Sequence, residues 1–166
     1  MNNPKKIALF PGTFDPFTLG HLSIVERGLN FADEVIIAIG INLDKKTLFT
    51  PEQRHEMVAR LFASNNRVKV VTYKGLTVDV AKSENASFIL RGLRSFTDFE
   101  YERSIAEVNR KIAGIETVFL FTEPEYAHIS SSTVRELLEW KRPADDLVPA
   151  DLHINDYIKQ LKINLK

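Results

Sequence analysis

The first group of residues able to do chemistry is a loop that ends in a histidine. Residues 11–21 read Pro-Gly-Thr-Phe-Asp-Pro-Phe-Thr-Leu-Gly-His, and a stretch with helical spacing begins at His21. Two glycines and two prolines in so short a loop predict a shaped turn. Gly20 would let a ligand approach the backbone. The free N–H groups of the helix start, together with the helix dipole, favour phosphate.

The histidine itself suits a reaction at phosphorus. His21 can donate a hydrogen bond or a positive charge to a developing oxyanion, which phosphoryl-type transfer needs more than it needs a base. By spacing alone, however, a single histidine is more often structural or solvent-exposed. Turn hydrogen bonding is the structural alternative for Thr13 and Thr18.

A second loop carries two adjacent lysines. Lys45 and Lys46 follow an apolar run and precede Thr50-Pro51, which predicts the cap and first position of a helix. A lysine ammonium is a mobile point charge suited to phosphate. A Lys-Lys pair in a loop is also a common solvated surface feature, and the pair alone does not separate the two readings.

Two arginines follow another apolar run. Arg91 and Arg94 lie around Gly92 and predict a fork-like clamp for a polyanion. Each could instead pair with a nearby carboxylate of residues 98–102, a common structural outcome. Spacing alone leaves both open.

Hydroxyl side chains open a later helix. Residues 130–133 read Ser-Ser-Ser-Thr, and one N-cap explains only one of the four hydroxyls. Hydroxyls and N–H groups at a helix start can hold further phosphates. The remaining loop of interest, residues 74–80 around Gly75, has the composition of an ordinary strand-to-helix turn.

These loops must be positioned by alternating strands and helices. Continuous apolar runs of the kind found in buried strands occur at 6–10, 34–41, 68–73, 87–90 and 117–121. Helical spacing occurs at 21–31, 51–63, 77–84, 98–113 and 130–140. We therefore predict an α/β fold, a doubly wound parallel five-stranded sheet of the Rossmann-like type, with ligands beyond the carboxyl ends of the strands.

The rest of the chain predicts a single domain over residues 1–166 with a C-terminal helix near 151–165. The apolar positions of that helix suit docking onto the core or a neighbouring subunit, and we favour the core; they are Leu152, Ile154, Tyr157, Ile158, Leu161 and Ile163. Helix 98–113 carries a modest apolar row of Phe99, Ile105, Val108 and Ile112, for which core packing is the structural reading and a contact with a neighbouring subunit the alternative.

Composition excludes several classes of function. The 166 residues include 22 basic and 22 acidic side chains, so no global field recruits nucleic acid or an anionic membrane. The absence of cysteine removes disulfides, thiolate catalysis and thiolate metal sites. The apolar run before Pro11 is too short for a signal-peptide core or a membrane span, so we expect a cytoplasmic protein.

Three segments carry a resemblance to a known family. PGTFDPFTLGH resembles the signature loop of the HxGH nucleotidyltransferase superfamily, with Thr18 at the first position as in the phosphopantetheine adenylyltransferases. RGLR followed by DFEYE, and ISSSTVRE, resemble the second and third signatures of that family. The three occur in the family's order and at its separations, and the resemblance covers Ile7 to about Trp140.

The resemblance implies reversible transfer of an adenylyl group from ATP to 4′-phosphopantetheine, giving 3′-dephospho-CoA and pyrophosphate in coenzyme A biosynthesis. It also implies Mg²⁺ bound with ATP and no protein metal cage, a homohexamer, and coenzyme A as a feedback inhibitor. Two alternatives remain open: a related cytidylyl- or adenylyltransferase for glycerol phosphate or nicotinate mononucleotide, and an ATP-binding regulator without turnover.

The resemblance also implies residue roles. The catalytic residues are His21, Lys45 and Arg94, with Lys46 as the alternative lysine. The acceptor-binding residues are Thr13, Lys45, Thr77 and Arg91. The ATP-binding residues are Thr13, Phe14, His21, Gly92, Leu93, Arg94, Glu102, Tyr126, Ala127, His128, Ile129, Ser130, Ser131 and Ser132.

Overall fold

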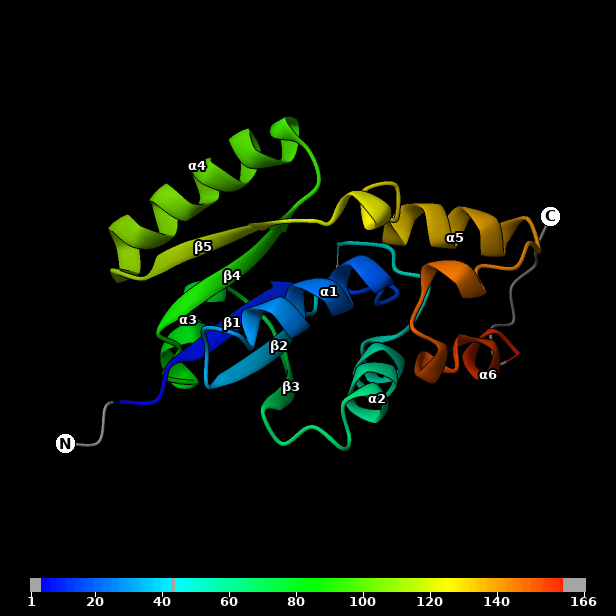
Figure 1. The fold of residues 1–166 in the computed structure, drawn as a ribbon, viewed down its shortest axis with the longest axis horizontal. Coiled ribbons are helices and arrows are strands. Elements are labelled where there is room, and N and C mark those ends of the chain that lie inside the picture. Colours follow the sequence, from blue (N-terminus) through cyan, green and yellow to red (C-terminus); the bar gives the residue numbers. More distant parts are fainter. Residues whose placement is uncertain (1–3, 43, 160–166) are drawn as a thin grey trace.

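The computed structural model describes residues 4–42 and 44–159 and contains one parallel sheet. Its strands run in the order β3-β2-β1-β4-β5 (Figure 1). They are β1 (Ile7–Gly12), β2 (Glu34–Gly40), β3 (Val68–Tyr73), β4 (Phe88–Leu93) and β5 (Glu116–Phe121). The predicted Rossmann-like fold is confirmed.

Helices cover both faces of this sheet. They are α1 (Leu19–Gly28), α2 (Pro51–Leu61), α3 (Thr77–Ser83), α4 (Phe96–Ala113), α5 (Ser131–Glu139) and α6 (Ile154–Ile158). The larger core cluster joins one face of the sheet to α1, α2 and α5, whereas the smaller cluster joins the other face to α3. Helix α4 lies on the opposite side of β4 and β5 from α1 (Figure 1). Within the described part of the chain, no helix has the length and apolar character needed to cross a membrane.

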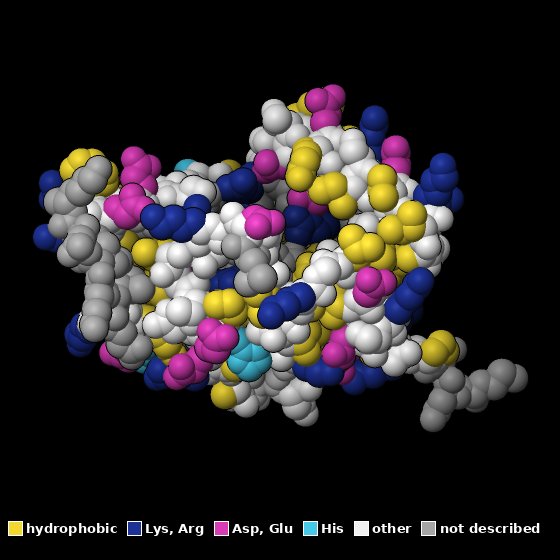
Figure 2. All heavy atoms as spheres, turned by 180° about the vertical axis from the view of Figure 1, so that it is seen from behind, with side chains coloured by type: hydrophobic (Ala, Val, Ile, Leu, Met, Phe, Trp, Pro, Cys, Tyr) yellow, Lys and Arg dark blue, Asp and Glu magenta, His cyan; other side chains and the backbone are white. Residues whose placement is uncertain are grey.

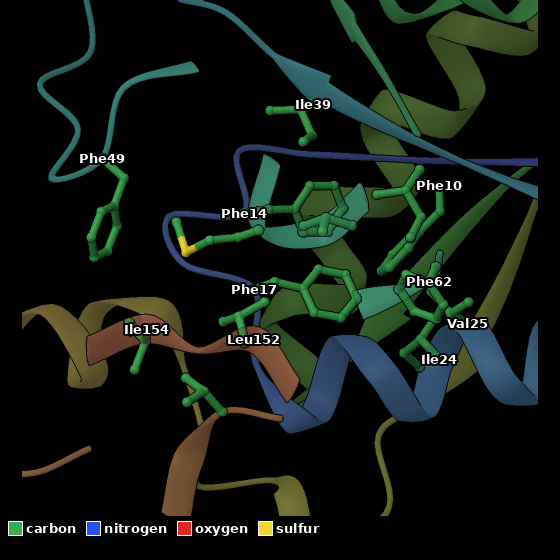
Figure 3. Packing of buried hydrophobic residues seen from close by; sticks show 14 of the residues in the cluster. Phe10, Phe14, Phe17, Ile24, Val25, Ile39, Phe49, Phe62, Leu152 and Ile154 are labelled. Atoms are coloured by element: carbon green, nitrogen blue, oxygen red, sulfur yellow. The ribbon is translucent and has the colours of Figure 1, made fainter. Parts of the chain in front are cut away.

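The larger core cluster extends under the first loop. Phe14 and Phe17 of that loop are buried beside Phe10 of β1 and face Ile24 and Val25 of α1 (Figure 3). Burial of each large apolar side chain contributes roughly 1.5–3 kcal/mol. The loop that ends at His21 is therefore anchored by the core beneath it.

The sheet opens between its first and fourth strands. The register of β1 with β2 runs from Ile7–Glu34 to Gly12–Ile39, whereas that of β1 with β4 joins Ala8 to Phe88 and Leu9 to Ile89. The chain after β1 enters α1 on one face, and the chain after β4 enters α4 on the other. This is the topological switch point at which open α/β sheets bind ligands.

The C-terminal segment departs from the prediction of one long helix. Two 3-10 turns, Asp145–Leu147 and Ala150–Leu152, precede the five-residue α6. His153 takes a left-handed conformation with φ of 50°, which interrupts helical geometry between the second turn and α6. Leu152, Ile154 and Tyr157 are buried, so the predicted docking onto the core is confirmed for them. Leu161 and Ile163 lie outside the described residues.

The core assignment of the α4 row is wrong. Val108 and Ile112 are 56% and 54% exposed, Ile105 is 38% exposed, and Phe99 is half-buried. Helical spacing shows which side chains share a face, but it does not show what covers that face. The expectation of strands buried on both faces also fails at the edge strand β3, where Lys69 and Thr72 are exposed.

Gly92 is required where α1 approaches β4. A Cβ at Gly92 would lie 2.9 Å from Ile24 Cγ1, whereas a Cβ at Gly20 would meet no atom closer than 3.8 Å. We expect Gly92→Ala to lower the free energy of unfolding by about 1–3 kcal/mol through overpacking. Gly20→Ala, the matched control, should change it by less than about 1 kcal/mol. Urea denaturation of both variants measures the difference, and equal stability would show that α1 moves away at no cost.

Candidate active site

Two adjoining cavities lie at the carboxyl ends of the strands. The first, of about 350 Å³, is lined by the loop after β1, the end of β4 and the start of α5. The second, of about 360 Å³, is lined by the ends of β1, β2 and β3 and by α4. Thr13, Lys45, Arg91 and Glu102 line both. Figure 2 shows Lys and Arg side chains inside the hollow beside α4.

His21 is held at the third position of α1 by a capping box. The Thr18 hydroxyl accepts the His21 N–H at 3.5 Å, and the Thr18 backbone N–H donates to His21 Nδ1 at 3.0 Å. The helix therefore begins at Leu19, two residues earlier than predicted. Because Nδ1 accepts a hydrogen bond, the proton of the neutral ring is on Nε2.

The imidazole of His21 is neutral. Burial, with smaller contributions from Arg91 and Arg94, lowers the pKa of His21 from 6.5 to about 3. Burial and the positive charges of both arginines disfavour protonation of the His21 ring. Of the two roles predicted for His21, the structure therefore favours hydrogen-bond donation over a positive charge.

Phe14 packs its ring against the His21 ring. Its ring meets the His21 ring edge-on, with centroids 5.0 Å apart, and is 3% exposed. A Cβ at Gly12 would lie 2.7 Å from Phe14 Cζ, so the ring occupies the space that a side chain at Gly12 would need. Phe14 has the predicted location beside the first cavity, but most of its surface packs into the core.

Lys45 reaches the junction of the two cavities. Its Nζ donates to Thr13 Oγ1 at 3.3 Å. Within the described part of the chain, Lys45 forms no ion pair, which leaves its charge available to an anion. Lys46 is exposed and lines neither cavity. The structure thus favours Lys45 over Lys46.

The arginines line the site and also form ion pairs. Arg91 Nε donates to Glu102 at 2.8 Å, its Nη2 donates to the same carboxylate, and its Nη1 donates to the Pro11 carbonyl. Arg94 Nε lies 3.4 Å from Asp98. The two readings of these arginines are compatible, since a guanidinium has five N–H donors. Glu102 reaches the site as the partner of Arg91.

The serines at the start of α5 are already hydrogen-bonded. Ser130 Oγ accepts the Thr133 N–H at 3.0 Å, and Ser131 Oγ donates to the Pro16 carbonyl at 2.8 Å. Ser132 Oγ accepts from Arg135 at 3.1 Å. These contacts turn the start of α5 toward the first loop, so its first-turn N–H groups border the first cavity.

Comparison with known proteins agrees with this geometry. The cytidylyltransferase-like family matches residues 9–137. Phosphopantetheine adenylyltransferase from Bacteroides thetaiotaomicron is 54% identical over 148 residues, which is 89% of this chain and 98% of that protein. The enzyme of the same name from Phocaeicola vulgatus is 55% identical over the same shares, and that from Geobacter metallireducens is 46% identical over 88% of this chain and 90% of its own length. The chain belongs to the phosphopantetheine adenylyltransferase family. The predicted resemblance is confirmed.

Most of the site residues implied by the family resemblance lie around the two cavities. Those that line the first are Thr13, Phe14, His21, Lys45, Arg91, Gly92, Arg94, Glu102, Ile129, Ser130, Ser131 and Ser132. All four acceptor residues line the second: Thr13, Lys45, Thr77 and Arg91.

Four of the predicted ATP-binding residues do not line the first cavity. The Leu93 side chain is buried, and its carbonyl accepts the Thr122 N–H at 2.7 Å. His128 and Ala127 are exposed. Tyr126 lies close to Gly20, since a Cβ at Gly20 would be 3.9 Å from Tyr126 Cβ. Their roles in ATP binding stay predictions.

Sequence reasoning missed several residues of the site. Asp15 and Asp98 line the first cavity, and Asn109 and Thr117 line the second. Thr18 was interpreted as a turn residue and as the first position of the family signature, but not as the cap of α1, although its spacing of three from His21 is that of a capping box. Asp15 and Asp98 lie within the family motifs but were given no site role, whereas Asn109 of α4 and Thr117 of β5 reach the second cavity only through the packing of those elements.

The neutral state of His21 predicts a pH effect on stability. Above pH 6.5 neither the folded nor the unfolded state binds a proton at His21, whereas between 6.5 and about 3 only the unfolded state does. Stability is therefore lost as the pH falls. We expect His21→Gln to remove about 2 kcal/mol of the loss between about pH 7.5 and about pH 5. Urea denaturation at both values measures it, with His128→Gln at an exposed histidine as the control. An unchanged loss in His21→Gln would contradict the low pKa.

The adjacent lysines form a matched pair. We expect Lys45→Ala to lower kcat for adenylyl transfer by about 10²-fold, because the charge at the junction of the cavities is removed. Lys46→Ala should stay within about twofold, since a solvated surface charge contributes little. Steady-state kinetics at saturating substrate measures both, and equal losses would place neither lysine at the reacting phosphate.

Proposed function

We propose that the chain transfers an adenylyl group reversibly from ATP to 4′-phosphopantetheine, giving 3′-dephospho-CoA and pyrophosphate in coenzyme A biosynthesis. The observation that carries this proposal is the junction of two cavities at Thr13, Lys45 and Arg91. A transferase that joins two substrates directly needs two subsites that meet at the reacting atoms. The names and high identity of the relatives support the choice of substrates.

The reaction is a single in-line displacement at phosphorus. An oxygen of the acceptor phosphate forms a bond to the α-phosphorus of ATP. The bond from that phosphorus to the bridging oxygen breaks, and its electron pair leaves with pyrophosphate. The acceptor is already an anion near neutral pH, so no strong base is needed, and positioning with charge stabilisation supplies most of the rate.

Each predicted catalytic residue fits one part of this step. His21 presents Nε2–H to an α-phosphoryl oxygen, and it retains that donor if bound phosphates raise its pKa. Lys45 and Thr13 are hydrogen-bonded at the junction of the two cavities, and there they would contact the acceptor phosphate and the transferred group. Arg94, with the first-turn N–H groups of α5, is placed to bind the phosphates that become pyrophosphate.

The second cavity suits the amide-containing arm of the acceptor. Thr117 Oγ1 is a buried oxygen for which the described residues offer no hydrogen-bond partner. It lines the cavity with Asn109 and with Ile105. A buried hydroxyl without a partner is costly, and an amide of the arm would satisfy it.

Magnesium is proposed as part of the MgATP substrate. Among residues 4–42 and 44–159, no group of three or more His, Asp or Glu side chains could hold a metal ion. Asp98 and Glu102, which line the first cavity, are paired with arginines. Oxygens of the ATP phosphates would therefore supply most of the protein-independent coordination of Mg²⁺.

The family resemblance also leads us to propose a homohexamer, feedback by coenzyme A and a cytoplasmic location. The exposed apolar side chains of α4 support assembly. Coenzyme A contains the pantetheine arm and would compete for the second cavity.

The test is pyrophosphate release from MgATP with 4′-phosphopantetheine, compared with nicotinate mononucleotide and with glycerol 3-phosphate plus CTP. We expect pyrophosphate release with phosphopantetheine as the acceptor and none with the other two acceptors. Pyrophosphate release with another acceptor would agree with the mechanism but would overturn the assignment of phosphopantetheine as the substrate. If ATP binds but no pyrophosphate is released with any of the three acceptors, the result would support an ATP-binding regulator without turnover.

A further inference from the structure

Asp15 is a buried carboxylate that the reaction described above does not use. It is 2% exposed and follows Phe14 in the first loop. Its Oδ2 accepts the Leu48 N–H at 2.8 Å, and its Oδ1 accepts the Phe49 N–H at 2.9 Å. The two oxygens thus bind consecutive backbone groups of the loop that carries Lys45. A buried charge is retained at such a place only if it is well hydrogen-bonded.

Asp15 is fixed in turn from the start of α5. Arg135 Nη1 donates to the Asp15 carbonyl at 2.8 Å and lies 3.8 Å from Asp15 Oδ2. The same guanidinium donates through Nη2 to Ser132. Arg135 therefore connects the hydroxyl-rich start of α5 to the first loop, and Asp15 continues the connection to the second loop.

A second buried side chain closes the same unit. Arg54 of α2, also 2% exposed, donates through Nε to the Phe49 carbonyl at 3.2 Å. Its Nη1 donates to the carbonyls of Thr13 and Gly40. Phe49 is thus held at its N–H by Asp15 and at its carbonyl by Arg54, while its ring is buried.

These contacts matter because the support of Lys45 on its N-terminal side is only a local turn, in which the Lys45 N–H donates to the Asn42 carbonyl at 3.2 Å and the Asp44 N–H donates to Asn42 Oδ1 at 2.9 Å. Lys45 and its neighbours Asp44 and Lys46 are exposed and belong to neither a helix nor a strand. The nearest firm anchor on its C-terminal side is the Leu48–Phe49 backbone. A small displacement of that anchor would move Nζ away from Thr13 and from the junction of the cavities.

We propose that Asp15, held by Arg135, is a positioning residue that keeps Lys45 at the junction of the two cavities. The kinetic part of this inference rests on the proposed function; the structural part does not. Asparagine at position 15 would retain one acceptor oxygen and turn an NH₂ group toward a backbone N–H. Asp15→Asn therefore loosens the Lys45 loop without removing volume.

The kinetic test is a double-mutant cycle with Lys45→Ala. We expect Asp15→Asn to lower kcat about tenfold or more in the native background and less than about twofold in the Lys45→Ala background, because residues that act as a unit are non-additive. The control Asp146→Asn, at an exposed aspartate, should leave kcat unchanged. Equal losses in both backgrounds, or no loss in the native background, would overturn the proposal.

Amide hydrogen exchange tests the same inference without substrate or turnover. Asp15→Asn should speed exchange in residues 44–49 and leave β2 unchanged. If Asp15→Asn does not fold, the Arg135→Gln variant replaces it in this test. Arg135→Gln should speed exchange in residues 44–49. The control Arg142→Gln, at an exposed arginine beyond α5, should leave that exchange unchanged. Unchanged exchange in residues 44–49 of the Arg135 variant would overturn the proposal. A failure to turn over phosphopantetheine with the exchange result intact would reject the proposed function alone.

Discussion

The hydrogen bond from Arg91 to the Pro11 carbonyl stands where β1 and β4 part, and the site depends on that parting. Beyond Leu9 and Ile89, the facing backbone groups of the two strands need other partners. A side chain of β4 supplies one of them and spans the gap. The sheet therefore stays joined while it opens a crevice, and the guanidinium that joins it lines both cavities.

The contacts that build local structure also set the chemistry of the site. The capping box that starts α1 fixes which nitrogen of His21 carries the proton. Gly92 permits the close packing of α1 on β4, which places His21 beside Arg91 and Arg94 and so contributes to its low pKa. Folding and preorganisation are here the same set of interactions, since the imidazole is oriented by the capping box of α1 and by the core rings of Phe10, Phe14 and Phe17.

The sequence allowed the fold class and the approximate positions of the strands to be predicted, because continuous apolar runs alternate with helical spacing. It also pointed to the loops of His21, Lys45, Arg91 and Ser130, through residue types and family motifs. The sequence did not allow the ionisation states and the hydrogen-bond partners of these residues to be predicted. The pKa of His21 depends on burial and on charges from another loop, and the choice between adjacent lysines depends on which of them reaches Thr13.

Other misses have the same origin in contacts between distant segments. Asp15 was quoted only as a letter of the first family motif and was given no role, because its partners Leu48, Phe49 and Arg135 lie in other segments. The α4 row was assigned to the core because its spacing is helical, although no segment among those described covers it. His153 takes a left-handed backbone conformation that residue type alone does not specify, so α6 begins at Ile154 and not at the expected residue 151.

Ile105 belongs both to the exposed row of α4 and to the wall of the second cavity. A surface that covered that row would therefore also contact the wall of the second cavity, where the acceptor arm is proposed to bind. By linkage, a ligand that changes the packing of Ile105 changes the affinity of the covering surface by the same factor as that surface changes the affinity of the ligand. The proposed assembly and the proposed binding of the acceptor would thus be coupled through one side chain.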